Sequence, residues 1–146
     1  MNTKPVVAQN LLRKSDIKIL LVDDREDNLY SIEAIFEKDN YTIVKANSGR
    51  EALKVLLKEQ DFSLILMDVQ MPEMDGLQAT AAIRKGEVMS GKHIPIIAMT
   101  AHAMVRDKEH CLKAGMDDYI TKPIRLEQLL DVLERYSLMT STEKVL

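Results

Sequence analysis

The stretch "LILMDVQMPEMDG", from Leu64 to Gly76, indicates the kind of fold that this sequence encodes. Four consecutive apolar residues end in one carboxylate, Asp68, and turn residues follow at Pro72 and Asp75. A short apolar run bounded by turn residues is typical of a strand that is buried on both faces of a sheet. We therefore expect Asp68 at the carboxyl end of a buried strand, where the chain leaves the sheet.

The chain on either side of this stretch alternates between strand-like and helix-like segments. Apolar and β-branched runs predict strands at residues 17–22, 41–46, 63–68, 94–100 and 119–120. Apolar residues at helical spacing predict helices at residues 27–39, 48–60, 76–85, 102–114 and 126–136. Short strands joined by helical crossovers run parallel, so the pattern predicts an α/β fold with a doubly wound sheet and helices on both faces.

Local signals set the expected ends of these helices. Ser48 and Glu51 have the spacing of a capping box at the start of the 48–60 helix. Gly115 is expected to end the 102–114 helix as a left-handed cap. After Lys85, "GEVMSGKH" is expected to be an exit loop, and "RKGE" is expected to be a solvated helix end.

Composition narrows the class of protein. A chain of 146 residues with 46% hydrophobic and 29% charged residues is expected to form one globular domain. The net charge of -3 and the absence of Trp argue against nucleic-acid binding. The single cysteine, Cys111, excludes an internal disulfide, and neither a membrane helix nor a signal peptide is evident. We expect a cytoplasmic protein without direct membrane contact, with a tail or linker at 1–15, one domain at 16–137 and a tail at 138–146.

Polar side chains follow four of the predicted strands. Asp23 and Asp24 come directly after the first strand, Asp68 ends the third, Thr100 ends the fourth, and Lys122 follows the fifth. A single Asp after a strand is most often a turn or helix-cap residue. Because the carboxyl ends of parallel strands share one edge of the sheet, the joint placement of these five residues predicts a site there.

The residue types restrict the chemistry of this predicted site. Three close carboxylates repel one another, so one must be protonated or a cation must neutralise them. Oxygen ligands without His or Cys favour Mg²⁺ over Zn²⁺. An Asp nucleophile beside Mg²⁺ is the pattern of aspartyl-phosphate chemistry, and a hydroxyl and an ammonium suit the oxygens of a phosphoryl group.

Four motifs together resemble the receiver domain of two-component response regulators. They are "LLVDDREDN", "LILMDVQMPEMDG", "IPIIAMTAH" and "AGMDDYITKPI", and the resemblance covers roughly residues 17–136. The sequences of these motifs are most similar to those of receivers attached to hybrid sensor histidine kinases. The resemblance implies a flavodoxin-like (βα)5 fold with strand order 2-1-3-4-5, Mg²⁺ as cofactor, and a histidine kinase or a histidine phosphotransfer domain as partner.

The resemblance also implies roles for individual residues. Asp68 is the expected phosphoacceptor, and Asp24, Asp23 and the backbone carbonyl of Gln70 are expected to bind Mg²⁺ with it, Asp23 largely through water. The implied partners of the phosphoryl group are Thr100 and Lys122.

The resemblance also implies residues that control the lifetime of the phosphoryl group or change conformation when it is present. Gln70 and His102 lie two residues after Asp68 and Thr100, at positions that tune the lifetime of the phosphate. Relatives often carry Asn at the position of His102; a solvent-facing role for this imidazole remains open, as does a pH-dependent lifetime. Tyr119 is expected to switch with Thr100 and to change the face formed by the 102–114 helix, the 119–120 strand and the final helix.

Rival functions are compatible with parts of the pattern. A stand-alone single-domain regulator differs from a hybrid-kinase receiver only in its attachment, so it stays open. A Mg²⁺-dependent phosphatase with an Asp nucleophile needs D-x-D, but this chain has Gln70 at the second position. A flavin domain needs a phosphate-binding loop where this chain has "DDREDN", and a pseudo-receiver would lack site residues that are present here. We expect a signalling domain with phosphotransfer and autodephosphorylation activity, and leave the oligomeric state open.

Overall fold

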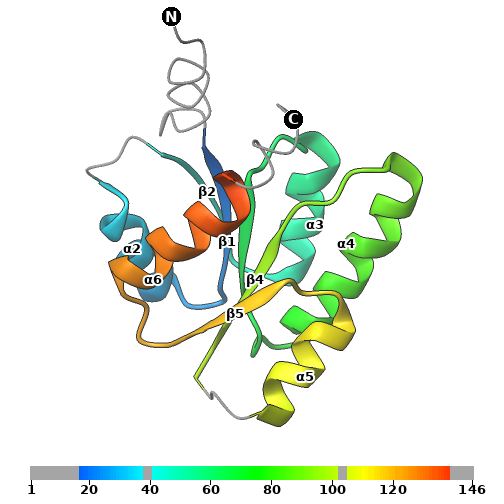
Figure 1. The fold of residues 1–146 in the computed structure, drawn as a ribbon. Coiled ribbons are helices and arrows are strands. Elements are labelled where there is room, and N and C mark those ends of the chain that lie inside the picture. Colours follow the sequence, from blue (N-terminus) through cyan, green and yellow to red (C-terminus); the bar gives the residue numbers. More distant parts are fainter. Residues whose placement is uncertain (1–16, 38–40, 102–104, 139–146) are drawn as a thin grey trace, which may run out of the picture.

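The computed structural model describes residues 17–37, 41–101 and 105–138, and element labels follow Figure 1. The strands in this part of the chain are β1 (Lys18–Val22), β2 (Thr42–Ala46), β3 (Leu64–Asp68), β4 (Ile96–Thr100) and β5 (Asp118–Thr121). They form one parallel sheet in the order β2-β1-β3-β4-β5. The expected strand order and the expected doubly wound sheet are both confirmed.

Helices cover both faces of this sheet. They are α2 (Glu26–Ile35), α3 (Gly49–Lys58), α4 (Gly76–Ser90), α5 (Val105–Ala114) and α6 (Leu126–Leu133), which continues as a π-helical turn over Glu134–Leu138. In Figure 1, α2 and α6 lie on one side of the sheet, and α3, α4 and α5 lie on the other. None of the helices in residues 17–37, 41–101 and 105–138 combines the length and apolar character that a membrane crossing needs.

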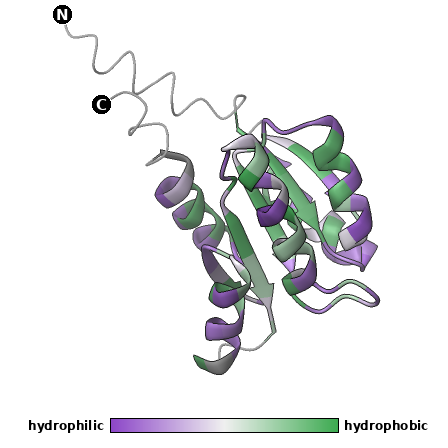
Figure 2. Ribbon diagram, turned by 90° about the vertical axis from the view of Figure 1, so that its right-hand side faces the viewer, coloured by the Kyte–Doolittle hydropathy of each residue, from purple (hydrophilic) through white to green (hydrophobic). Residues whose placement is uncertain are grey.

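The apolar runs of the central strands are continuous because each strand faces two cores. Every residue of β3 and β4 is buried, and successive side chains point to opposite faces of the sheet. Leu64 and Leu66 pack with α2 and α6, whereas Ile65 and Met67 pack in the core on the side of α3, α4 and α5. In Figure 2 the strands are accordingly mostly green, while the helices carry both purple and green.

The start of α3 differs in one detail from the expected capping box. The Ser48 hydroxyl accepts a hydrogen bond from the Glu51 amide at 3.0 Å, as predicted. The Glu51 carboxylate does not return to Ser48: it accepts from the amide of Asn47 at 2.9 Å. Both side chains therefore still pair with backbone donors at this helix start, with the second bond one residue further upstream.

The end of α4 corrects the prediction from sequence. The helix does not stop at Lys85; it continues through "GEVMS" to Ser90, and Gly91 then takes the left-handed conformation with φ 74°. The expectation of a solvated "RKGE" end is wrong as well. The side chains of Arg84 and Glu87 are only 17% and 12% exposed, because they bind the neighbouring strand ends.

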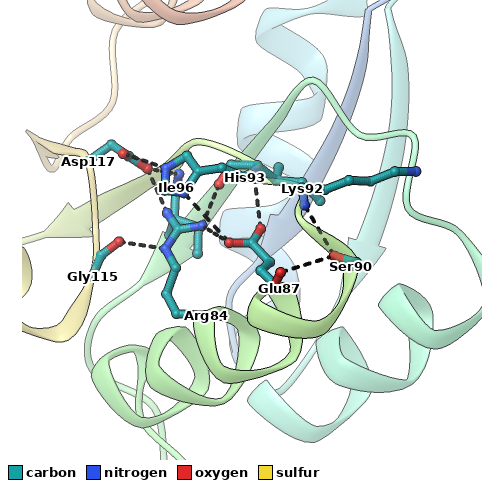
Figure 3. Close-up of polar contacts among 9 residues, drawn as sticks. Arg84, Glu87, Ser90, Lys92, His93, Ile96, Gly115 and Asp117 are labelled. Carbon is teal, nitrogen blue, oxygen red and sulfur yellow. Dashed lines mark hydrogen bonds and ion pairs between the residues drawn. The ribbon is translucent and has the colours of Figure 1, made fainter.

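Arg84 is the centre of a polar network at the amino ends of β4 and β5 (Figure 3). Its guanidinium donates to the carbonyl oxygens of Gly115 at 2.8 Å and Ile94 at 2.9 Å, and it also pairs with Glu87 at 2.6 Å and Asp117 at 2.7 Å. These contacts tie the second half of α4 to segments that lie 10 and 31 residues further along the chain. They supply the tertiary reason why the helix continues past Gly86.

Asp117 and His93 complete this network. The Asp117 carboxylate accepts from the amide of Ile96 at 2.8 Å, and the Nε2 atom of His93 lies 2.9 Å from its other oxygen. The Nδ1 atom of the same imidazole lies 3.6 Å from Glu87. Asp117 thus anchors the start of the β4–β5 pair.

Candidate functional site

Three carboxylates meet at the carboxyl edge of the sheet. Asp23 follows β1 and is fully buried, Asp68 ends β3 and is 5% exposed, and Asp24 is exposed to solvent. Each carboxylate offers a ligand oxygen, and these oxygens lie within 4.8 Å of one another. The structure therefore brings together the acidic residues that the sequence placed at this edge.

Lys122 reaches into this acidic cluster from the end of β5. Its Nζ atom lies 3.1 Å from an oxygen of Asp23 and 3.2 Å from an oxygen of Asp68. The backbone amide of Lys122 donates to the carbonyl oxygen of Thr100 at 2.8 Å, and the following peptide bond to Pro123 is cis. The lysine is thus held at the edge by backbone geometry as well as by its charge.

The electrostatics of the cluster favour a divalent cation. Burial raises the pKa of Asp68 to about 6, the charge of Asp23 adds to this increase, and Lys122 opposes it. Burial lowers the pKa of Lys122, but the charges of Asp68 and Asp23 outweigh this effect and raise it above its usual range. One ammonium cannot neutralise three carboxylates, and the donor set consists of oxygens at a spacing that fits a small hard ion such as Mg²⁺.

The remaining predicted site residues lie around this cluster. Thr100 is buried at the last position of β4, and the amide of Gln70 donates to Asp68 at 3.3 Å. Tyr119 is half-buried on β5, where the ammonium of Lys108 lies 5.1 Å from the centre of its ring. His102 lies outside the described residues, so its predicted role stays a prediction.

Two residues that support the site had no assigned role in the sequence. The side-chain amide of Asn28 donates to the Asp23 carboxylate at 3.3 Å, and the amide of Arg25 donates to it at 3.0 Å. These donors orient Asp23 toward the other carboxylates. An Asn in the first turn of a helix resembles an ordinary surface residue, so no local signal marks Asn28.

Gly76 shapes the loop that follows Asp68. Its amide donates to the carbonyl oxygen of Val69 at 2.9 Å, and a Cβ atom at this position would overlap the carbonyl oxygen of Asp68. The loop can return onto the end of β3 only because position 76 has no side chain. The Asp75–Gly76 turn signal therefore has a specific steric basis at the site.

Comparison with known families identifies this arrangement. The family described as "Response regulator receiver domain" matches residues 19–134. The chain is a receiver domain. It belongs to the family through which two-component phosphorelays operate, and the identity that the four motifs predicted is confirmed.

Individual relatives support the same assignment. Hybrid signal transduction histidine kinase I of Dictyostelium discoideum is 44% identical over 120 residues, which cover 80% of this chain but only 7% of that protein. The receiver domain of sensor histidine kinase PA1611 from Pseudomonas aeruginosa PAO1, solved with a magnesium ion in its active-site cleft, is 38% identical with a TM-score of 0.74, covering 83% of this chain and 97% of that one.

A third relative was solved together with a partner. The Ssk1 receiver domain of Saccharomyces cerevisiae, in complex with the histidine phosphotransfer protein Ypd1, is 28% identical with a TM-score of 0.80. The match covers 86% of this chain and 92% of that one. That receiver domain therefore pairs with a histidine phosphotransfer protein.

Proposed function

We propose that Asp68 accepts a phosphoryl group from a phosphohistidine, and that this receiver belongs to a hybrid sensor histidine kinase. The observation that carries the assignment of Asp68 is its position at the sheet edge, where the Nζ atom of Lys122 contacts both Asp68 and a second buried carboxylate, Asp23. The alternative of a stand-alone single-domain regulator uses the same site. The phosphatase alternative is disfavoured because Gln70 lacks the acid-base group that such enzymes need at this position.

The proposed transfer step uses groups that already lie at the site. An Asp68 oxygen attacks phosphorus, the P–N bond of the phosphohistidine breaks, and its electron pair returns to the imidazole, leaving an acyl phosphate on Asp68. Mg²⁺, held by Asp23, Asp24, Asp68 and the backbone carbonyl of Gln70, would neutralise the carboxylates and the transferred oxygens. Lys122, which pairs with Asp68 at 3.2 Å, is placed to pair with a phosphoryl oxygen after transfer.

The proposed switch runs from Thr100 to Tyr119. Thr100 is the last residue of β4 and pairs in register with Thr121 of β5, two positions after Tyr119. The acyl phosphate adds about 1.5 to 2 negative charges at neutral pH, which would draw the Thr100 hydroxyl toward the new oxygens. Tyr119 would then turn inward and change the surface of α5, β5 and α6, while Gln70 and His102 set the lifetime of the phosphate.

The proposed donors are a histidine kinase and a histidine phosphotransfer domain. Two relatives support this assignment: a hybrid histidine kinase, and a receiver solved with the phosphotransfer protein Ypd1. We propose that the donor docks over the loops around Asp68 and along α2, which begins two residues after Asp24. No nucleic acid is part of the proposed relay, and the domain limits at residues 16 and 137 remain a prediction.

Intact mass after incubation with acetyl phosphate tests the proposal. We expect one phosphoryl increment that requires Mg²⁺ and that is absent from Asp68→Asn. The matched control is Asp61→Asn, which alters an exposed carboxylate that pairs with Lys18 outside the cluster. An increment that survives in Asp68→Asn would reject Asp68 as the acceptor. If acetyl phosphate fails, a phosphorylated histidine phosphotransfer protein is the second donor, and no transfer from either would reject the proposed function.

A further inference from the structure

An apolar groove lies between the second halves of α3 and α4. Its volume is about 290 Å³, and its apolar walls are formed by Leu53, Leu56, Leu57, Ala82, Ile83, Gly86 and Ile94. Leu57 at its edge is 83% exposed, and Met89 on the adjoining face of α4 is 90% exposed. The start of α4 lies against Asp68 through Gly76, so the groove lies toward the opposite end of this helix, away from the acidic cluster.

Gly86 in the wall of this groove has no explanation within the domain. Gly76 avoids a backbone overlap and Gly91 takes a positive φ, but Gly86 is helical and a Cβ atom there would meet nothing within 4 Å. Glycine in a helix interior is destabilising relative to Ala. A position that lacks a side chain in a groove wall allows the backbone of another helix to approach closely, which gives Gly86 a role that packing within the domain does not.

The charges around the groove are unequal in sign. The acidic residues near it share their cations: Arg84 pairs with both Glu87 and Asp117, and Lys18 pairs with both Glu59 and Asp61. By contrast, Lys54, Lys58 and Lys85 are exposed, adjoin groove residues in sequence, and form no ion pair within the described part of the chain. Lys92 also lines the groove, so six cations (these three lysines, Lys92, Lys18 and Arg84) lie around it against four carboxylates, and the rim is positive.

We propose that this groove binds an acidic amphipathic helix of a partner protein. An apolar stripe at positions i, i+3, i+4 and i+7 is the pattern that fills such a groove, and Asp or Glu on its flanks would face the lysine rim. A second copy of this domain would bring the same lysines to the interface and repel it. Residues 1–16 carry three basic side chains and one acidic side chain, so they also have the wrong sign for the rim.

A panel of helix-stabilised peptides of about four turns tests the proposal by fluorescence anisotropy. Each peptide has a leucine stripe and either Glu or Lys on the flanks, and the panel varies the spacing of the leucines. We expect saturable binding of acidic members only, with an affinity that falls as salt is raised. No saturable binding across the acidic panel, or equal binding of acidic and basic members, overturns the proposal.

Two variants of α4 locate the binding. Gly86→Leu places a side chain in the groove and should weaken binding about tenfold or more, a change of about 1.4 kcal/mol. Ala81→Leu is the matched control, because it adds the same side chain at an exposed position of α4 that does not line the groove. Equal affinity in Gly86→Leu and the unaltered protein overturns the proposal.

Charge and self-association provide independent readouts. Reversal of Lys54 and Lys85 to Glu should weaken the acidic peptides, flatten their salt dependence and leave acetyl phosphate uptake at Asp68 unchanged. Sedimentation of the domain alone distinguishes the other occupant: self-association that Gly86→Leu abolishes would assign the groove to a second copy and refute the partner helix. The circular dichroism spectrum of each variant serves as the control that it is folded.

Discussion

The sharpest prediction concerns the stability of the magnesium-free domain when Asp68 is replaced by Asn. Asp68 is 5% exposed, and burial together with Asp23 raises its pKa to about 6 from the ordinary value of 3.8. A raised pKa in the folded state means that folding favours the protonated acid. This contribution is complete below about pH 4 and is lost as the pH rises through about 6.

The magnitude follows from the same pKa values. The difference between about 6 and 3.8 corresponds to about 3 kcal/mol of stability lost between pH 4 and pH 7.5. Asn keeps the size of the side chain and removes the charge, although it also weakens the contact with Lys122. We therefore expect Asp68→Asn to be about 1 to 3 kcal/mol more stable than the unaltered domain at pH 7.5, and about equal to it below about pH 4.

Urea unfolding in EDTA at several pH values measures this difference. Effects of the other acidic residues occur in both proteins and cancel in the comparison, so the pH dependence of the difference reports Asp68. Addition of Mg²⁺ should then stabilise the unaltered domain more than the variant, because the ion binds only the folded state and uses the Asp68 oxygen. A difference that does not change with pH, or a variant less stable than the unaltered domain at pH 7.5, refutes the electrostatic reasoning.

Three further substitutions test other parts of the fold by chemical denaturation. Arg84→Ala should lower the free energy of unfolding by about 3 to 5 kcal/mol, because it leaves two largely buried carboxylates, Glu87 and Asp117, without their shared cation. A loss below about 1 kcal/mol would show that His93 or water replaces the guanidinium. Gly86→Ala should raise stability by about 0.5 to 1 kcal/mol, because the new methyl group meets open space in a helix interior, and a decrease would contradict the helical assignment past Lys85. Gly76→Ala should lower the free energy of unfolding by about 1 to 3 kcal/mol and also slow phosphoryl uptake, because the added Cβ displaces the loop after Asp68. Unchanged uptake would contradict the close approach of position 76 to the Asp68 carbonyl oxygen.

The parts of the fold that the sequence predicted are those with a local physical cause. A strand of a parallel sheet is buried on both faces, so β3 and β4 are short apolar runs that can be identified without knowledge of their neighbours. The acidic cluster was predictable for a related reason. A polar residue that ends such a run must lie at the carboxyl edge of the sheet, and parallel strands bring all such residues to one edge.

The parts that the sequence did not predict depend on distant contacts. Gly86 is a local signal for a helix end, but Arg84 and Glu87 extend α4 through bonds to residues that come later in the chain. Asn28 likewise becomes part of the site only because the first turn of α2 lies beside Asp23. In both cases tertiary contacts outweigh local propensity, which differs by about 1 kcal/mol or less between Gly and the better helix formers.

The two polar clusters of this domain lie at opposite ends of the β4–β5 pair, and this placement bears on how a change at Asp68 is transmitted. At the amino end, the Asp117 carboxylate accepts from the Ile96 amide, and the Asp117 amide donates to the Ile96 carbonyl oxygen. The Arg84 guanidinium joins Asp117 to α4. At the carboxyl end, the Lys122 amide donates to the carbonyl oxygen of Thr100, next to the acidic cluster itself. A new charge on Asp68 therefore acts on the end of β4 and β5 that lies away from the contacts of Arg84. We infer that α4 and the end of α5 next to Gly115 stay fixed while Thr100, the Tyr119 side chain and the start of α5 move, since the guanidinium network binds Gly115 as well as the amino ends of both strands.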